Sequence, residues 1–124
     1  MKKILIIDDN ADLRAMMRLV IETDGYQVYE AENGFVGLSL IDSVQPDLVL
    51  LDVSMPVMTG AELIVELARR ASPRSFKIIT MSGRRNAGGA LTKWFLLKPV
   101  SATLLKAVVR DFCERSTTAA MAGA

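Results

Sequence analysis

Histidine is absent from this chain of 124 residues, and cysteine occurs only once, as Cys113. Without histidine, the chain cannot form the common zinc-binding sets or the serine–histidine and cysteine–histidine pairs of many hydrolases. A single cysteine cannot form a disulfide within the chain, which favours a protein from a reducing compartment. Carboxylates, hydroxyls and amines therefore remain as the groups that can carry chemistry.

Long apolar segments and a strong charge imbalance are also lacking. The apolar run near the N-terminus, Ile4–Ile7, is followed directly by Asp8, so it is too short for a signal peptide or a membrane span. The formal net charge is +1, which gives no reason to expect an extended electrostatic surface for nucleic acids or membranes. We expect a cytoplasmic protein that makes no direct contact with nucleic acid or membrane.

The sequence does contain enough apolar residues for one globular domain. Hydrophobic residues make up 51% of the chain, and its length suits a single core. From residue 116 onward the residues are mostly small or polar. We therefore expect the domain to cover residues 1–115 and residues 116–124 to form a flexible tail.

Short apolar runs alternate with amphipathic segments along the chain. The predicted strands are Ile4–Ile7, Gln27–Ala31, Leu48–Leu51, Lys77–Met81 and Trp94–Leu97. Helices are predicted after a cap at Asn10, over Phe35–Val44 and Ala61–Ala71, and after a cap at Ser101, where one face carries Leu104, Leu105, Val108, Val109 and Phe112. This alternation predicts an α/β fold with a parallel sheet covered by helices on both faces.

Polar residues stand at the ends of four predicted strands. They are Asp8 and Asp9 after the first strand, Asp52 after the third, Ser82 after the fourth and Lys98 after the fifth. In open α/β sheets the functional site lies beyond the carboxyl ends of the strands, so these side chains should converge. Neighbouring carboxylates need a cation or bound protons, and Mg²⁺ accepts carboxylate oxygens alongside phosphate. With a lysine and a hydroxyl beside them, the set suits phosphoryl transfer.

Each of these residues also has an ordinary structural explanation. An aspartate after a strand is often a turn residue or a helix cap, Ser82 could be a turn hydroxyl, and Lys98 could be a solvated surface charge. The site interpretation gains its weight because all of these groups fall at the same edge of the predicted sheet.

Four segments carry a resemblance to a known family. They are Ile4–Asn10 (ILIIDDN), Pro46–Gly60 (PDLVLLDVSMPVMTG), Ile78–Gly83 (IITMSG) and Phe95–Pro99 (FLLKP). Over about residues 2–115 the chain resembles the receiver domains of two-component response regulators. The resemblance implies a flavodoxin-like, doubly wound, five-stranded parallel sheet in the order 2-1-3-4-5. It also implies a signalling module that catalyses only its own phosphorylation and dephosphorylation and is not an enzyme with a separate substrate.

The resemblance also implies roles for individual residues. Asp52 matches the aspartate that accepts a phosphoryl group from a histidine kinase or a histidine phosphotransfer protein. Asp9 matches a direct Mg²⁺ ligand, and Asp8 matches one that acts mainly through water. Asp52 and the backbone carbonyl of Ser54 complete the implied Mg²⁺ ligands. Lys98 matches the lysine that pairs with the phosphoryl group.

Two further residues match the switch of the family. Ser82 matches the hydroxyl that binds a phosphoryl oxygen, and Phe95 matches the aromatic residue that turns inward when this hydroxyl moves. Phosphorylation would then change a face that binds a downstream protein, which the sequence does not identify. The Lys98–Pro99 peptide bond is cis in this family.

The chain departs from the family pattern between Ser82 and Lys98. Positions 83 to 97 give 15 intervening residues, fewer than most receivers have, and they include Gly88 and Gly89. Glycine inside a helix costs about 1 kcal/mol relative to alanine. We therefore predict that the fourth helix, over residues 84–92, is short, distorted or absent.

Two other functions compete with the receiver interpretation. A phosphatase of the haloacid-dehalogenase type also uses an aspartate at a strand end, but it requires a second acid where this chain has Ser54. A pseudo-receiver would keep the fold and bind partners without phosphorylation. The intact set of Asp8, Asp9, Asp52 and Lys98 argues against this alternative, whereas the short fourth region argues mildly for it.

Overall fold

The computed structural model describes residues 1–55, 57–70, 76–83 and 94–121. Its five parallel strands are β1 (Lys3–Ile7), β2 (Gln27–Ala31), β3 (Leu48–Asp52), β4 (Lys77–Ser82) and β5 (Trp94–Leu97). They form one sheet in the order β2-β1-β3-β4-β5. Both the parallel sheet and the strand order are confirmed.

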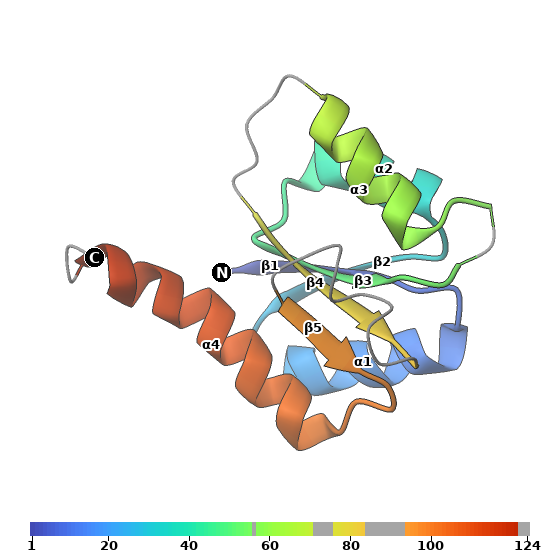
Figure 1. Cartoon of the computed structure of the whole chain (residues 1–124). Helices are drawn as coiled ribbons and strands as arrows, with labels where there is room; N and C mark the ends of the chain where they lie inside the picture. Colours follow the sequence, from blue (N-terminus) through green and yellow to red (C-terminus); the bar gives the residue numbers. More distant parts are fainter. Residues whose placement is uncertain (56, 71–75, 84–93, 122–124) are drawn as a thin grey trace.

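Within the described residues the strands are accompanied by four helices, α1 (Ala11–Thr23), α2 (Gly34–Val44), α3 (Gly60–Arg69) and α4 (Ala102–Met121). Figure 1 shows α2 and α3 on one face of the sheet and α1 and α4 on the other. The short, distorted or absent helix predicted for residues 84–92 lies outside the described residues. None of the described helices combines the length and apolar character that crossing a membrane requires.

The core has two layers because successive side chains of a strand point to opposite faces of the sheet. In β1, Ile4 and Ile6 pack with the α1 and α4 side, whereas Leu5 and Ile7 pack with the α2 and α3 side. All four side chains are fully buried. This double burial explains why the central strands are continuous apolar runs.

Polar caps set the starts of the helices. The Asn10 side chain accepts a hydrogen bond from the Leu13 N–H at 3.0 Å, which confirms the predicted cap of α1. Thr59 and Glu62 form a reciprocal capping box at the start of α3. This capping box explains why α3 begins at Gly60, one residue before the predicted start.

The last helix differs from expectation in its apolar face. Leu104 was placed on that face by its spacing, but it is 45% exposed, whereas Leu105, Val109 and Cys113 are buried. Residues four apart lie on one side of a helix, and Leu104 falls outside this row. The helix continues to Met121, past the domain boundary expected at residue 115. That boundary and the flexibility of residues 116–124 stay predictions.

Candidate functional site

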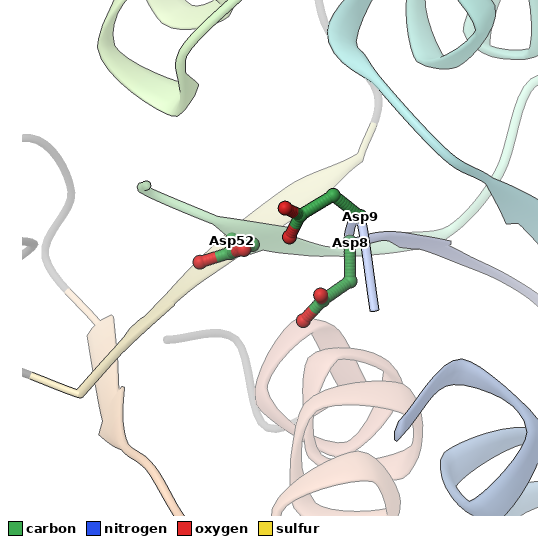
Figure 2. Close-up of side chains that lie close together, drawn as sticks. All are labelled: Asp8, Asp9 and Asp52. Atoms are coloured by element: carbon green, nitrogen blue, oxygen red, sulfur yellow. The ribbon is translucent and has the colours of Figure 1, made fainter. Parts of the chain in front are cut away.

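Three carboxylates meet at the carboxyl ends of the two central strands. Asp8 directly follows β1, and Asp52 is the last residue of β3, which pairs with β1 so that Ile7 lies beside Leu51. One oxygen from each of Asp8, Asp9 and Asp52 lies within 4.8 Å of the others. Figure 2 shows the three side chains close together. The predicted convergence of these carboxylates is therefore present in the structure.

Asp8 is the most enclosed of the three carboxylates. Its side chain is fully buried, its Oδ2 accepts a hydrogen bond from Lys98 Nζ at 2.7 Å, and its Oδ1 accepts one from the Asn10 N–H at 2.9 Å. A buried charge is tolerated when it is paired and hydrogen-bonded in this way. Asp8 therefore pairs with Lys98 and also holds the backbone of the loop between β1 and α1.

Lys98 reaches the carboxylates from the end of β5. Its backbone N–H donates to the Ser82 carbonyl at 2.7 Å, and the Lys98–Pro99 peptide bond is cis, as the resemblance implied. The ammonium group also lies 3.4 Å from Asp52 Oδ1. Lys98 thus faces two of the carboxylates, with its shorter contact to Asp8.

The environment of Asp52 disfavours its charged form. The residue is only 3% exposed, and burial is the largest cause that raises the pKa of its carboxyl group from 3.8 to about 6, followed by the nearby Asp8. Lys98 and the backbone N–H of Ser54, 3.2 Å from Asp52 Oδ1, oppose this rise. A cation or a positive reacting centre near Asp52 would therefore be attracted strongly.

The donor set fits a hard divalent cation. The cluster contains three carboxylates but only the one ammonium group of Lys98, which contacts two of them, so it keeps an excess of negative charge when all of these groups are ionised. Oxygen ligands of this kind, with an exposed Asp9 open to water, suit Mg²⁺, which retains several water molecules. The described residues bring together no histidine or cysteine ligand that would favour a softer metal.

The remaining predicted site residues lie around this cluster. Ser82 is buried at the end of β4, and Ser54 is exposed two residues after Asp52. Phe95 is partly buried in β5, where it pairs in register with Thr80, two positions before the pair of Ser82 and Leu97. The structure thus places Ser82 at the predicted edge, whereas the switch roles of Ser82 and Phe95 and the ligand role of Ser54 stay predictions.

Two residues support the site through contacts that the sequence did not predict. Arg14 Nη1 donates to the backbone carbonyl of Asp8 at 2.6 Å. Gly60 packs directly against the Asp52 backbone, where a Cβ atom would lie 2.7 Å from the Asp52 carbonyl oxygen. An arginine on a helix and a glycine after a turn are too common to indicate such roles on their own.

We predict that Gly60→Ala lowers the free energy of unfolding by about 1–3 kcal/mol, because the new methyl group would meet backbone atoms that have no alternative rotamer. Urea unfolding measures this change. Gly83→Ala is the matched control, since a Cβ at Gly83 meets nothing within 4 Å. Equal stability of the two variants would contradict the close approach of Gly60 to Asp52.

Comparison with known proteins agrees with this geometry. The model of the response regulator receiver domain family matches residues 4–110. The chain belongs to this family. Because the family is assigned over most of the chain, the haloacid-dehalogenase alternative is set aside.

Several curated relatives place the chain within this family. Chemotaxis protein CheY of Listeria monocytogenes is 34% identical over 109 residues, which cover 82% of this chain and 90% of CheY. Sporulation initiation phosphotransferase F of Bacillus subtilis is 35% identical over 65% of this chain and 64% of its own length. The sensor histidine kinase TmoS of Ectopseudomonas mendocina is 34% identical over 88% of this chain, but the match spans only 12% of the kinase.

Solved structures show the same fold. The chemotaxis response regulator CheY4 of Vibrio cholerae superposes with a TM-score of 0.81 at 25% identity, covering 90% of this chain and 98% of the other. A CheY-like receiver domain protein from Methanospirillum hungatei gives a TM-score of 0.78 at 26% identity, covering 95% of this chain and 98% of the other. Receiver domains are signalling modules, so the fold and family define this chain as part of a signalling system.

Proposed function

We propose that this receiver domain accepts a phosphoryl group on Asp52 with the help of Mg²⁺ and then presents a changed surface to a partner protein. The observation that carries the proposal is the cluster itself. A buried Asp52 carboxylate lies beside Asp8 and Asp9 and 3.4 Å from an ammonium group, at the end of a central strand. Membership of the receiver domain family supports phosphoryl transfer as the class of reaction.

The proposed transfer is a displacement at phosphorus. A carboxylate oxygen of Asp52 forms a bond to the phosphorus atom of a phosphohistidine, and the bond from phosphorus to the imidazole nitrogen breaks with its electron pair left on the nitrogen. Positioning and charge neutralisation supply most of the catalysis in such reactions. Lys98, already within reach of Asp52, would pair with a phosphoryl oxygen.

Asp8, Asp9, Asp52 and the backbone carbonyl of Ser54 would hold Mg²⁺. When bound, Mg²⁺ offsets the negative charge of the carboxylates and of the incoming phosphoryl group. The positive charge of the ion would also favour the ionised, nucleophilic form of Asp52 at neutral pH, despite the burial that raises the pKa of this residue. The chain would later release phosphate by hydrolysis of its own aspartyl phosphate, with no separate substrate.

Two residues of β4 and β5 would transmit the modification. Ser82 would donate its hydroxyl to a phosphoryl oxygen, and Phe95 would turn inward as the chain after Ser82 shifts. A local gain of charge would then change a surface made by the ends of these strands. We propose a cytoplasmic setting, a histidine kinase or histidine phosphotransfer protein as donor, and a protein as the downstream target.

Incubation with acetyl phosphate tests the proposal, with the phosphorylated form separated on a phosphate-affinity gel. A retarded band should form with Mg²⁺ and disappear with a chelator or in Asp52→Asn. Asp12→Asn is the matched control, because Asp12 is an exposed aspartate near the same end of the sheet. Phosphoramidate, whose phosphorus–nitrogen bond resembles that of phosphohistidine, serves as a second donor.

Absence of any retarded band with both donors, in a chain that circular dichroism shows to be folded, would contradict phosphorylation on Asp52. That result would favour the pseudo-receiver, which binds its partners without phosphate.

A further inference from the structure

Arg14 connects the acidic cluster to β2 at the edge of the sheet. It lies in the first turn of α1, and its guanidinium group donates two hydrogen bonds to different partners. Nη1 donates to the backbone carbonyl of Asp8 at 2.6 Å, and Nε donates to Glu30 Oε1 at 3.1 Å. The Arg14 side chain is 15% exposed, so these bonds are largely shielded from water.

Glu30 holds Arg14 from the neighbouring strand. It lies in β2 beside Ile6 of β1, and its second carboxylate oxygen accepts a hydrogen bond from Arg18 Nη1 at 3.0 Å. Arg18 in turn bonds Glu22 at 3.2 Å on the exposed side of α1. The chain of contacts therefore runs from a solvated helix surface, through Glu30 and Arg14, to the peptide group of Asp8.

The contact with Asp8 fixes more than one carbonyl group. The Asp8 carbonyl and the Asp9 N–H belong to one planar peptide unit, so holding the carbonyl sets the plane from which the Asp9 side chain departs. The Asp8 N–H is held on its other side by the Ala31 carbonyl at 3.1 Å. The backbone that carries two of the three clustered carboxylates is thus bonded on both sides of Asp8.

We propose that Arg14, held in place by Glu30, is a positioning residue that fixes the peptide between Asp8 and Asp9 and so sets the affinity and selectivity of the acidic cluster for Mg²⁺. This inference depends on the proposed function, since it requires that the cluster binds Mg²⁺. Mg²⁺ demands nearly ideal ligand geometry, whereas Ca²⁺ accepts a looser one. Loss of the Arg14 contact therefore weakens Mg²⁺ binding more than Ca²⁺ binding.

Positioning and simple charge predict opposite results for Arg14→Met. If Arg14 acted only through its positive charge, its removal would strengthen the binding of any divalent cation to the carboxylates. Positioning predicts weaker Mg²⁺ binding although a positive charge has been removed. A general loss of stability would leave the ratio of Mg²⁺ to Ca²⁺ affinity in the folded protein unchanged.

Titrations with MgCl₂ and CaCl₂ at constant ionic strength, followed by the amide resonances of the labelled protein, measure both affinities and report whether each variant is folded. For Arg14→Met we expect Mg²⁺ binding at least fivefold weaker and a ratio of Mg²⁺ to Ca²⁺ affinity at least threefold lower. Arg14→Lys should give an intermediate loss, because an ammonium group lacks the fork that reaches both partners.

Arg18→Met is the matched control, since it removes the other arginine that contacts Glu30, and Arg18 donates to Glu30 and Glu22 and not to the Asp8 peptide. Its Mg²⁺ affinity should stay within twofold of the wild type. If Arg14→Met does not fold, Glu30→Gln replaces it, because glutamine keeps the shape of the side chain and removes its charge. We expect the same direction of change for Glu30→Gln.

The outcomes separate this inference from the function on which it depends. A wild-type chain that binds Mg²⁺, with Arg14→Met binding it equally well or more tightly, would overturn the positioning role and leave the proposed function standing. A wild-type chain that binds no Mg²⁺ would overturn both.

Discussion

Asp52→Asn is expected to abolish phosphorylation and at the same time to stabilise the metal-free protein above pH 6. Asparagine has nearly the shape of aspartate but lacks the anionic oxygen that forms the bond to phosphorus. It also removes a charge from a buried position beside Asp8, where both burial and that neighbour disfavour ionisation. This one substitution thus tests whether Asp52 accepts the phosphoryl group and how much its buried charge destabilises the folded protein.

The sign of the pH dependence follows from the pKa of Asp52. Because the pKa of this carboxyl group rises from 3.8 to about 6 in the folded chain, folding takes up a proton between these values. The free energy of unfolding of the wild type should fall as the pH rises from 4 through 6, by up to about 3 kcal/mol at about 1.4 kcal/mol per pKa unit. In Asp52→Asn this contribution is absent.

Urea unfolding at pH 4, 6 and 8 with a chelator present measures this difference. Asp52→Asn should exceed the wild type by about 1–3 kcal/mol at pH 8, since the lost ion pair with Lys98 offsets part of the gain, and the two should be similar at pH 4. The control Asp12→Asn should follow the pH profile of the wild type. If the stability of Asp52→Asn showed the same pH dependence as the wild type, this would contradict a raised pKa of the buried Asp52 carboxyl group.

Lys98→Met is expected to have the second large effect, in the opposite direction. Its removal leaves the fully buried Asp8 carboxylate without its 2.7 Å partner, and Asp52 loses the same neighbour. Leaving a buried charge unpaired costs about 3–5 kcal/mol, and partial exposure of Lys98 reduces the expected loss to about 2–3 kcal/mol at pH 8. Phosphorylation from acetyl phosphate should also slow by at least roughly tenfold.

Mg²⁺ should restore part of the stability that Lys98→Met loses, because the metal ion supplies positive charge beside the carboxylates in place of the missing ammonium group. Thermal unfolding with and without MgCl₂ measures the effect, and the Mg²⁺-dependent rise in Tm should be larger for Lys98→Met than for the wild type. Lys106→Met is the control, since Lys106 contacts Asp24 at 3.9 Å on the surface and its pair is expected to contribute less than about 1 kcal/mol. An equal loss of stability in Lys98→Met and Lys106→Met would refute the view that Lys98 stabilises the fold by pairing with the buried Asp8 carboxylate.

The strands and the convergence of the site were predictable because they depend on strong local signals. The strand over Leu48–Asp52 is buried at every position, so its sequence is a continuous apolar run that ends at a carboxylate. Parallel topology then places this carboxylate and Asp8 at the same edge of the sheet. That their two strands are neighbours was implied only by the family resemblance, and the pairing of β1 with β3 confirms it.

The supporting contacts were not predictable, because they depend on distances between elements. Arg14 looks like any charged residue on a helix, and only the packing of α1 against β1 and β2 brings its guanidinium to both Asp8 and Glu30. The spacing of Leu104 suggested a buried position, but the row of residues that faces the sheet begins at Leu105. Helical periodicity specifies a face only to within about one residue.

Locating the modified residue tests the central claim most directly. The chain is treated with acetyl phosphate and Mg²⁺ and then reduced with borohydride, which converts an aspartyl phosphate into homoserine, and its peptides are sequenced by mass spectrometry. We predict homoserine at position 52 only, and none when Mg²⁺ is withheld. Homoserine at Asp8 or Asp9 instead, or an unmodified Asp52 in a folded chain, would contradict the assignment of Asp52 as the phosphoryl acceptor.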